Sequence, residues 1–458
     1  MFTHTLLLPL LLLLLSGALP QMIPLSDAIR PLPSTPTPSP LPSSPSYINP
    51  YYAALSLDRL IQCDYDEDKG VWRREGLWQT ANTLETTANL IHLFRLLEEN
   101  PQPSHLGSPS FKQNISTYFL NILRNSFGKT GPFMDHCYDD YQWWLLAWVR
   151  AYSVDPNIAY LQRAATIFDR ITTVWSADEC GGGVIWCPTN HYKNAITNEL
   201  FLTSAMRLHP YASLLARDKD FYISWARKEW AWFEESGMIN GDKLINDGLT
   251  NTCTNNGQNT WTYNQGVLLD GLALLGTANS NTTLINIANS LLQASMKRLS
   301  DSQGILTEKC VAGGCGTDGN LFKGIYMRHV RYYADILTGT ADSKHVRVDR
   351  HGSPLSTSPK SPFSSNNITG LSTHLSNISE DISAFQAANA ESILAHDTCA
   401  TEYHDVAWQG PCVSPDAATM SAATDALWAA ASVNVVKPGA WVRGCVGAWV
   451  RGCVNDFL

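Results

Sequence analysis

Apolar residues recur at spacings of three and four along most of this chain, which is the period of one face of an α-helix. The first such stripe runs from Leu77 through Ala81, Leu84 and Ala88 to Ile91. Strand-like alternation is hard to find, so the pattern predicts an all-α protein. Further stripes of this period cover residues 144–151, 159–168, 195–208, 222–235, 267–275, 283–299, 326–337, 385–394 and 418–431.

The predicted helices are about 12 to 20 residues long and are joined by loops that carry Gly, Asp, Cys and Asn. Helices of this kind favour hairpins that close into one toroid of paired helices, which needs about twelve of them. An open helical solenoid is the alternative, but it would show a self-similar period, and none is found. One helical domain over residues 51–430 is therefore expected.

The N-terminal 50 residues are predicted to lie outside this domain. Residues 1–20 contain the apolar run Leu6 to Leu15 followed by small residues, which is typical of a secretory signal peptide. Residues 21–50 are rich in Pro and Ser and are expected to form an extended linker. The mature protein is therefore expected to be secreted, either extracellular or in a cell wall.

Two other segments interrupt the helical pattern. Residues 343–381 are rich in Ser, Asn and Pro, and we expect a low-complexity surface insertion there. The tail, residues 431–458, is expected to be irregular, and it contains the octapeptide 439–446 again at 447–454. Because the tail lacks a long hydrophobic end, a GPI anchor is expected only if the natural C-terminal sequence differs.

The composition narrows the class of ligand. The chain has 458 residues with 41 acidic and 32 basic side chains, a net charge of −9, and only 16% charged residues. This balance gives no support for a nucleic-acid or anionic-membrane partner. Many Ser, Thr, Asn, Trp and Tyr residues suit a neutral polar ligand such as a sugar. Four glycosylation sequons, at Asn114, Asn281, Asn367 and Asn377, fit a secreted glycoprotein.

Eleven cysteines in a secreted chain indicate disulfides, with at least one thiol left over. Sequence proximity predicts three pairs, Cys180/Cys187, Cys310/Cys315 and Cys399/Cys412. Longer-range pairing is expected among Cys63, Cys137 and Cys253. No CxxC or HExxH pattern is present, so we expect neither a metal nor a cofactor.

Two adjacent aspartates, Asp139 and Asp140, lie at the start of the helix predicted to run to Tyr152. Glycoside cleavage needs two carboxylates about 5 to 5.5 Å apart when one is the nucleophile. Neighbouring residues at a helix start reach this separation, because their α-carbons are about 3.8 Å apart. The alternative is that one aspartate caps the helix and the other complements its dipole. Spacing alone leaves both interpretations open.

Longer motifs around these aspartates resemble glycoside hydrolase family 76, the endo-α-1,6-mannanase family. The first is Tyr138-Asp139-Asp140 with Trp143-Trp144 and Leu146-Ala147-Trp148. Three more follow in the order of the family, CGGGVIW at 180–186 with YKNAITNELFL at 192–202, WTYNQG at 261–266 and FKGI at 322–325. The likeness extends from about residue 76 to 328 and more weakly to about 430.

The resemblance implies an (α/α)6 barrel and a retaining mechanism, with Asp139 as the nucleophile and Asp140 as the acid/base. It also suggests substrate-binding residues, each of which has a structural alternative as a helix cap, a helix bridge or a core aromatic residue. These candidates are Asn82, Trp143, Trp144, Asn198, Glu199, Asp247, Tyr263, Asn264, Gln265 and Lys323. Trp186 is a further candidate for stacking on a sugar ring.

The function implied is a fungal-type endo-hydrolase of α-1,6-mannosidic linkages in mannan or mannoprotein glycans. One alternative is a wall transglycosidase that links mannose-bearing GPI glycans to a wall glucan acceptor. Another is a non-catalytic mannan-binding wall protein. No nucleic-acid partner is expected, and the protein is expected to be a monomer.

Overall fold

The computed structural model describes residues 48–99, 109–133, 136–339, 369–396, 404–412 and 415–436. All of these ranges belong to one unit of the chain, Pro42–Leu458. The predicted signal peptide, most of the predicted linker and the duplicated octapeptide lie outside the described residues. Among the helices that are described, none is long and apolar enough to span a bilayer.

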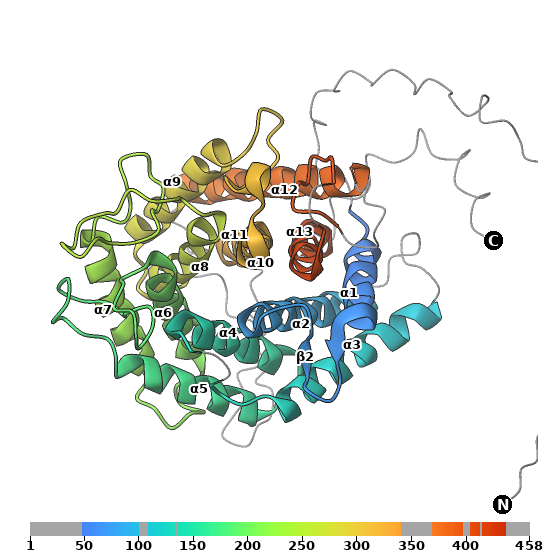
Figure 1. The fold of residues 1–458 in the computed structure, drawn as a ribbon, viewed down its shortest axis with the longest axis horizontal. Coiled ribbons are helices and arrows are strands. Elements are labelled where there is room, and N and C mark those ends of the chain that lie inside the picture. Colours follow the sequence, from blue (N-terminus) through green and yellow to red (C-terminus); the bar gives the residue numbers. More distant parts are fainter. Residues whose placement is uncertain are drawn as a thin grey trace, which may run out of the picture. The chain divides into compact units, whose positions relative to one another are not determined.

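Six of the described helices form an inner ring, in which each helix packs against the next and the last packs against the first (Figure 1). These helices are buried around almost their whole circumference. In the third of them, for example, every residue except Arg207 is buried. The six are α2 (Leu77–Glu99), α4 (Tyr138–Val154), α6 (Ala195–Leu208), α8 (Thr262–Ala278), α11 (Phe322–Thr338) and α13 (Ala417–Val436).

An outer helix packs against each inner helix and buries only one face. In α5 that face consists of Tyr160, Leu161, Ala164, Phe168 and their apolar neighbours. The outer helices are α1 (Pro50–Asp64), α3 (Pro109–Lys129), α5 (Ile158–Thr172), α7 (Phe221–Glu235), α9 (Thr282–Arg298) and α12 (Thr369–Ala395). The pairing confirms the predicted all-α fold, an (α/α)6 barrel.

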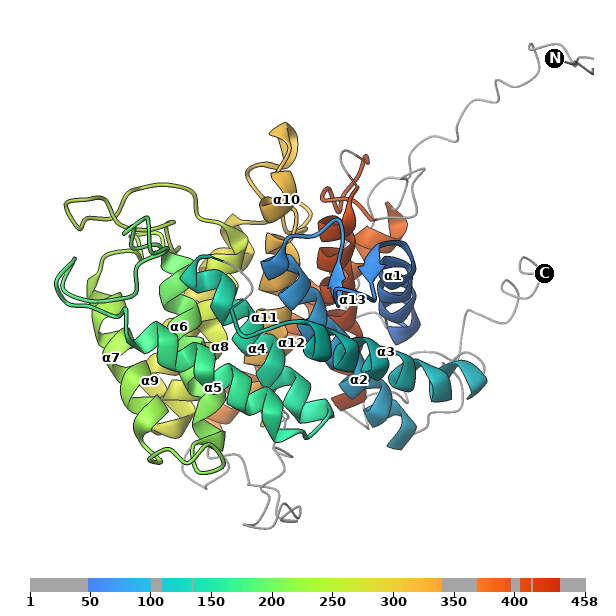
Figure 2. The ribbon, with the colours of Figure 1, turned by 60° about the horizontal axis from the view of Figure 1, so that its bottom comes forward.

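Small elements complete the described fold, among them two 3-10 helices, His209–Tyr211 and Val311–Gly313. Strands β1 (Tyr65–Asp66) and β2 (Val71–Trp72) form an antiparallel pair, and the short helix α10 (Gly316–Gly319) precedes α11. Figure 2 shows α10 at the same end of the ring as the loops that lead into α6 and α8. This end of the ring carries the candidate site described below.

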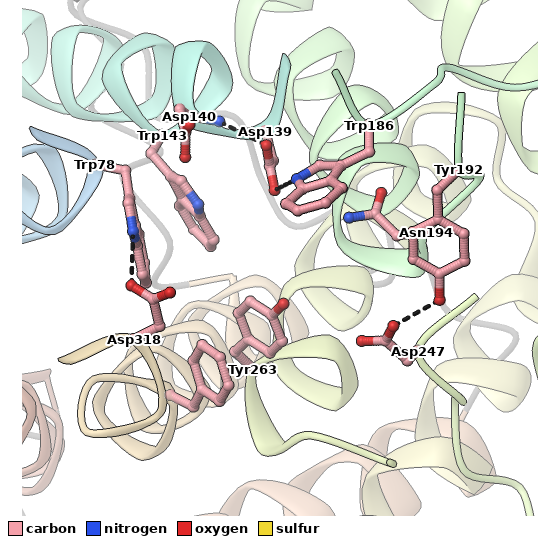
Figure 3. Close-up of a pocket in the computed structure, with 11 residues that line it drawn as sticks. Trp78, Asp139, Asp140, Trp143, Trp186, Tyr192, Asn194, Asp247, Tyr263 and Asp318 are labelled. Carbon is pink, nitrogen blue, oxygen red and sulfur yellow. Dashed lines mark hydrogen bonds between the residues drawn. The ribbon is translucent and has the colours of Figure 1, made fainter. Parts of the chain in front are cut away.

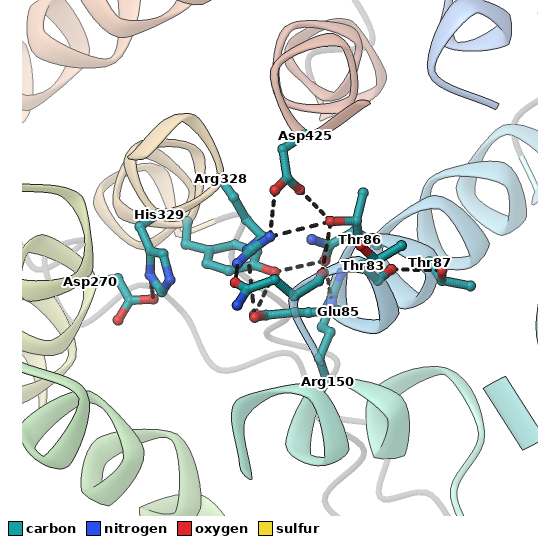
Figure 4. Close-up of polar contacts among 12 residues, drawn as sticks. Thr83, Glu85, Thr86, Thr87, Arg150, Asp270, Arg328, His329 and Asp425 are labelled. Atoms are coloured by element: carbon teal, nitrogen blue, oxygen red, sulfur yellow. Dashed lines mark hydrogen bonds and ion pairs between the residues drawn. The ribbon is translucent and has the colours of Figure 1, made fainter. Parts of the chain in front are cut away.

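A buried polar network joins the first and last inner helices (Figure 4). Arg328 on α11 donates to Asp425 on α13 and to Asn82 on α2, and all three side chains are almost completely buried. Removing one partner would leave an uncompensated buried charge, which is strongly destabilising. The network therefore favours the register in which α2, α11 and α13 close the ring.

Three helices differ from the sequence-based expectation. Helices α1 and α3 lie outside the predicted stripes, although α3 buries Ile115, Phe119 and Leu123 at helical spacing. Helix α12 begins at Thr369, inside the segment assigned to the low-complexity insertion. Its Ser- and Asn-rich start concealed the period, which the buried Ile378 and Ile382 now reveal. Residues 343–368 of that segment lie outside the described residues.

The disulfides correct one prediction and confirm another. The predicted pair Cys180/Cys187 is wrong, because Cys180 pairs with Cys253 and Cys187 pairs with Cys137. Between the two cysteines the chain turns at Gly181 and Gly183, which have positive φ, and Val184 pairs with Trp175, so the cysteine side chains meet different neighbours.

The predicted pair Cys310–Cys315 is confirmed. Cys412 is disulfide-bonded, while its predicted partner Cys399 lies outside the described residues. In the part of the chain that the structure describes, Cys63 is a free thiol.

Close backbone contact between inner helices depends on glycine. A Cβ added at Gly324 on α11 would lie 2.4 Å from Cα of Ala422 on α13. A Cβ added at Gly266 on α8 would lie 2.8 Å from Cα of Tyr326 on α11. Because backbone atoms cannot yield as a flexible side chain can, these glycines set the spacing of the ring.

We expect Gly324→Ala to lower the free energy of unfolding by about 1–3 kcal/mol, the usual cost of overpacking a core. Gly128→Ala is the matched control, because it lies in helix α3 with no atom within 4 Å of the added Cβ. It should be neutral or stabilising by up to about 1 kcal/mol. Urea unfolding followed by circular dichroism measures both variants, and equal stability of the two would contradict the packing argument.

Candidate active site

A cavity of about 350 Å³ opens where the N-terminal ends of five inner helices meet (Figure 3). Four carboxylates line it, together with six aromatic rings and one amide. Helix N-termini carry partial positive charge, which favours carboxylates at this end of the ring. The lining residues are Trp78, Asp139, Asp140, Trp143, Trp186, Tyr192, Asn194, Asp247, Tyr263, Asp318 and Phe322.

The aspartate pair lies in the first turn of α4, and neither aspartate is the N-cap residue, which is Cys137. Trp186 Nε1 donates to Asp139 Oδ2 at 2.9 Å, and the backbone N–H of Asp140 donates to Asp139 Oδ1 at 3.1 Å. One carboxylate oxygen of Asp139 lies within 4.8 Å of one of Asp140. Asp139 is only 9% exposed, so its carboxylate is held in a fixed orientation at the cavity wall.

Trp186 is held in place by its covalent and backbone connections to α4. The disulfide Cys137–Cys187 joins the residue after Trp186 to the N-cap of the helix that carries the aspartates. The backbone N–H of Tyr138 also donates to the carbonyl of Trp186 at 2.8 Å. The indole and the carboxylate that it contacts therefore belong to one cross-linked unit.

The glycine run before Trp186 passes directly beneath another indole. A Cβ added at Gly182 or Gly183 would lie 2.5 Å from the ring of Trp232. Gly183 also has φ of +82°, in the left-handed region that favours glycine. The same Trp232 donates from Nε1 to the carbonyl of Cys180 at 2.8 Å. This packing explains why the sequence has glycine at these two positions.

Asp247 lines the side of the cavity opposite Asp139 and Asp140 (Figure 3). Tyr192 Oη donates to Asp247 Oδ2 at 2.6 Å, and Trp261 Nε1 donates to Oδ1 at 3.1 Å. Burial, and then the hydrogen bond to Asp247, raise the pKa of Tyr192, so its phenol remains a donor at neutral pH. Both oxygens of Asp247 are thus oriented, as are those of Asp139.

Aromatic rings form the floor and one side of the cavity. Tyr263 stacks on Phe322 with ring centroids 3.9 Å apart, and Trp78 lies 6.0 Å from Trp143. Burial raises the pKa of Tyr263 well above its usual value, and the neighbouring carboxylates of Asp247 and Asp139 add to this effect. Tyr263 therefore stays neutral and can donate a hydrogen bond to a ligand.

The structure brings together Asp139, Asp140, Trp143, Asp247 and Tyr263 of the residues predicted from the sequence. The other predicted residues are buried outside the cavity lining. Trp144 belongs to the core and stacks on Trp148, and Asn82 belongs to the network around Arg328.

Glu199 and Asn264 are completely buried on α6 and α8, and within the described residues their side chains have no hydrogen-bond partner. Burial raises the pKa of Glu199 well above its usual value, and the charge of Asp247 raises it further. Both effects favour the protonated form of the Glu199 carboxyl group.

Three predicted residues anchor loops. Asn198 bonds to both the N–H and the carbonyl of Val184, and Gln265 bonds to both groups of Ile245. Lys323 Nζ donates to the carbonyl of Leu306 at 3.2 Å and lies 4.0 Å from the centroid of the Trp408 ring. Burial lowers the pKa of Lys323 to about 7.

Several cavity residues were missed by the sequence analysis as site residues. Tyr192, Asn194 and Phe322 lie within the recognised motifs, so their positions beside the named candidates were a usable signal. Trp186 was named for sugar stacking, whereas its indole N–H donates to Asp139. Trp78 and Asp318 gave no signal, because they are more than 200 residues apart and meet only in the folded ring.

The sequence is similar to a known family and to named fungal proteins. A model of glycosyl hydrolase family 76 matches residues 110–403. Mannan endo-1,6-alpha-mannosidase DCW1 of Saccharomyces cerevisiae is 31% identical over 41% of this chain and 42% of its own length. Mannan endo-1,6-alpha-mannosidase DFG5 of Candida albicans is 26% identical over 42% of this chain and 45% of its own length. The chain thus matches less than half the length of these relatives.

Solved structures share the fold. Dfg5 from Chaetomium thermophilum in complex with glucosamine superposes with a TM-score of 0.61, at 18% identity over 84% of this chain and 89% of that chain. An alpha-1,6-mannanase of Salegentibacter sp. HEL1_6 gives 0.59, at 17% identity over 83% of this chain and 98% of that chain. That structure is an inactive variant with two adjacent aspartates replaced by alanine, in complex with alpha-1,6-mannotetrose.

A buried acid supports the segment that carries Trp186. Glu229 on α7 accepts from Trp175 Nε1 at 2.6 Å, and Trp175 pairs with Val184. Desolvation is the largest effect on Glu229 and raises its pKa to about 8. The folded state therefore binds more protons than the unfolded state between about pH 4.5 and 8, and the stability that this gives is lost as the pH rises through 8.

We expect Glu229→Gln to reduce the loss of stability between pH 5 and pH 8.5 by up to several kcal/mol, since one pKa unit corresponds to about 1.4 kcal/mol. The amide oxygen can still accept from Trp175, so the local structure should persist. Glu234→Gln, an exposed site on the same helix, is the control and should leave the pH dependence unchanged. Urea unfolding at several pH values measures this, and parallel curves for wild type and Glu229→Gln would contradict the argument.

Proposed function

This chain belongs to glycosyl hydrolase family 76, and we propose that it is a retaining endo-hydrolase of α-1,6-mannosidic linkages. The observation that carries the proposal is the oriented aspartate pair Asp139 and Asp140 in a cavity lined by aromatic rings. The names of its curated relatives support the linkage, and the inactive mannanase variant supports a role for two adjacent aspartates.

The geometry suits a double displacement. One oxygen of Asp139 and one of Asp140 lie within 4.8 Å, which fits the short carboxyl separation of retaining enzymes. In the proposed first step, Asp139 attacks the anomeric carbon while Asp140 protonates the departing glycosidic oxygen. Water then attacks the mannosyl ester, and Asp140 accepts its proton.

The cavity chemistry fits a neutral sugar. Among the described residues, its lining includes four carboxylates and no Lys or Arg, so an anionic group on the ligand would be repelled. Aromatic faces can pack against the apolar face of a pyranose, and the oriented carboxylates of Asp139 and Asp247 can accept from its hydroxyl groups. We therefore propose α-1,6-mannan or a mannoprotein glycan as the substrate.

The extracellular location is also a proposal. The described disulfides Cys137–Cys187, Cys180–Cys253 and Cys310–Cys315 require an oxidising compartment. We propose that the protein is secreted and acts at a cell wall, where mannoprotein substrates lie.

Hydrolysis is tested with linear α-1,6-mannan as the substrate. We expect shortened oligomers whose new reducing ends first form in the α configuration, as resolved by proton NMR during the reaction. Products of inverted configuration would contradict the retaining mechanism. Transfer to an added β-glucan in place of water would favour the transglycosidase, and binding without turnover would favour the non-catalytic alternative.

The two aspartates should differ in their dependence on the leaving group. Asp139→Asn should abolish turnover of every substrate, because no glycosyl ester forms without the carboxylate. Asp140→Asn should lose cleavage of mannan but retain the first step for aryl mannosides, whose leaving group needs no protonation. Added azide should then yield mannosyl azide with retained configuration.

Single-turnover and steady-state kinetics with both substrates measure these effects. If the aspartates served only the helix end, both variants would lose about 0.5–2 kcal/mol of stability with no dependence on the leaving group.

A further inference from the structure

We propose that Asp318 is a positioning residue that holds Trp78 as a platform for the sugar on the leaving-group side of the scissile bond. The proposal rests on the proposed function and extends it to a second part of the cavity. Asp318 lies on the short helix α10, whereas Trp78 lies on α2, much earlier in the chain. Only the closed ring brings these residues together.

Asp318 receives two hydrogen bonds from α2 at the same oxygen. Trp78 Nε1 donates to Asp318 Oδ1 at 3.2 Å (Figure 3), and Gln79 Nε2 donates to the same oxygen at 2.7 Å. Trp78 is partly exposed and Asp318 is exposed, so the surrounding packing constrains them less than it constrains Trp143. The bond from Trp78 Nε1 therefore helps to orient the Trp78 ring, and the bond from Gln79 holds Asp318 in place to accept it.

Helix α10 is itself held at both ends. The disulfide Cys310–Cys315 closes a short loop immediately before it. Gly319, at its end, packs so closely on this disulfide that an added Cβ would lie 2.9 Å from Cβ of Cys315. The next residue, Asn320, donates from Nδ2 to Asp416 Oδ2 at 2.8 Å, just before α13. These contacts place Asp318 accurately although α10 has only four residues.

The two aspartates give the cavity a direction. In Figure 3, Asp140 lies on the side of Trp143 and Trp78, and Asp139 faces Trp186. The acid/base must reach the glycosidic oxygen, which belongs to the leaving group, while the nucleophile contacts the anomeric carbon. The sugar that departs is therefore expected on the side of Asp140, where the ring of Trp78 and the carboxylate of Asp318 line the wall.

The chemistry of this wall matches a pyranose. An indole face offers a rigid apolar surface for the C–H groups of the sugar. Asp318 lines the cavity, and its second oxygen, which Figure 3 shows turned away from Trp78, can accept from a sugar hydroxyl group. A tilted or mobile indole would lose most of this contact, so removal of Asp318 should weaken binding of the leaving-group sugar specifically.

Two substrates distinguish the contribution of the leaving-group side of the cavity from that of the other side. α-1,6-Mannotetraose places mannose on both sides of the scissile bond, whereas an aryl α-1,6-mannotrioside cleaved at its aryl group has no sugar on the leaving-group side. We expect Asp318→Ala and Trp78→Ala to raise KM for mannotetraose about tenfold. For release of the aryl group, kcat and KM should stay within about twofold of wild type.

Asp318→Asn distinguishes positioning from charge. Its amide oxygen can accept from Trp78 and Gln79, so we expect KM for mannotetraose within about threefold of wild type. Asp242 is an exposed aspartate that pairs with Arg298 outside the cavity. The control variant Asp242→Ala should therefore leave kcat and KM unchanged for both substrates. The double variant Cys310→Ser and Cys315→Ser, which releases the loop before α10, should show the same selective loss as Asp318→Ala, but smaller.

The positioning role would be overturned if Asp318→Ala raised KM equally for the two substrates, or raised it for neither. If the wild-type protein turned over neither substrate, the proposed function would fail. Calorimetry would then still test the positioning role, by measuring the binding of mannotetraose to the double variant Asp139→Asn and Asp140→Asn. Adding Asp318→Ala should weaken binding about tenfold, and an unchanged Kd would count against the proposal.

Discussion

The hydrogen bond from Trp186 Nε1 to Asp139 is the contact on which the organisation of the site depends. A carboxylate at the start of a helix is stabilised in many orientations by the helix dipole, which does not select one of them. The indole N–H selects one, and it does so only if the Trp186 backbone is fixed. The disulfide Cys137–Cys187, the glycines beneath Trp232 and the side chain of Asn198 all fix that backbone.

Four carboxylates around one small cavity would repel one another in an arbitrary fold. Here much of the lining comes from helix starts, and the two carboxylates other than Asp139 and Asp140 accept indole or phenol hydrogen bonds. Asp247 accepts from Tyr192 and Trp261, and Asp318 accepts from Trp78 and Gln79. Neutral donors orient these acids without neutralising them, so the cavity keeps a negative field that suits a neutral, hydroxyl-rich ligand.

Much of the fold could be predicted from the sequence, because inner and outer helices share the period of apolar residues. The aspartate pair was also recognisable, since its two members are adjacent in the chain. What escaped prediction depends on contacts between distant segments. Local spacing suggested Cys180/Cys187, but the two residues pair with the more distant Cys253 and Cys137. The pairing of Trp78 with Asp318 has no local signature for the same reason.

Three polar residues taken from the motifs as candidate sugar ligands share a different task. Each of the loops before α6, α8 and α11 contains a β-bridge whose second residue is a buried aliphatic one, Val184, Ile245 or Leu306.

In each case a side chain of the following inner helix bonds to the backbone of that aliphatic residue. Asn198 and Gln265 satisfy both its N–H and its carbonyl. At Leu306, Lys323 takes the carbonyl and Asn389 takes the N–H. Buried backbone groups must be paired, so an amide that reaches both is a natural solution. Because Asn, Gln and Lys perform this same task, the barrel repeats a structural device without repeating its sequence, and a search for a sequence period could not reveal it.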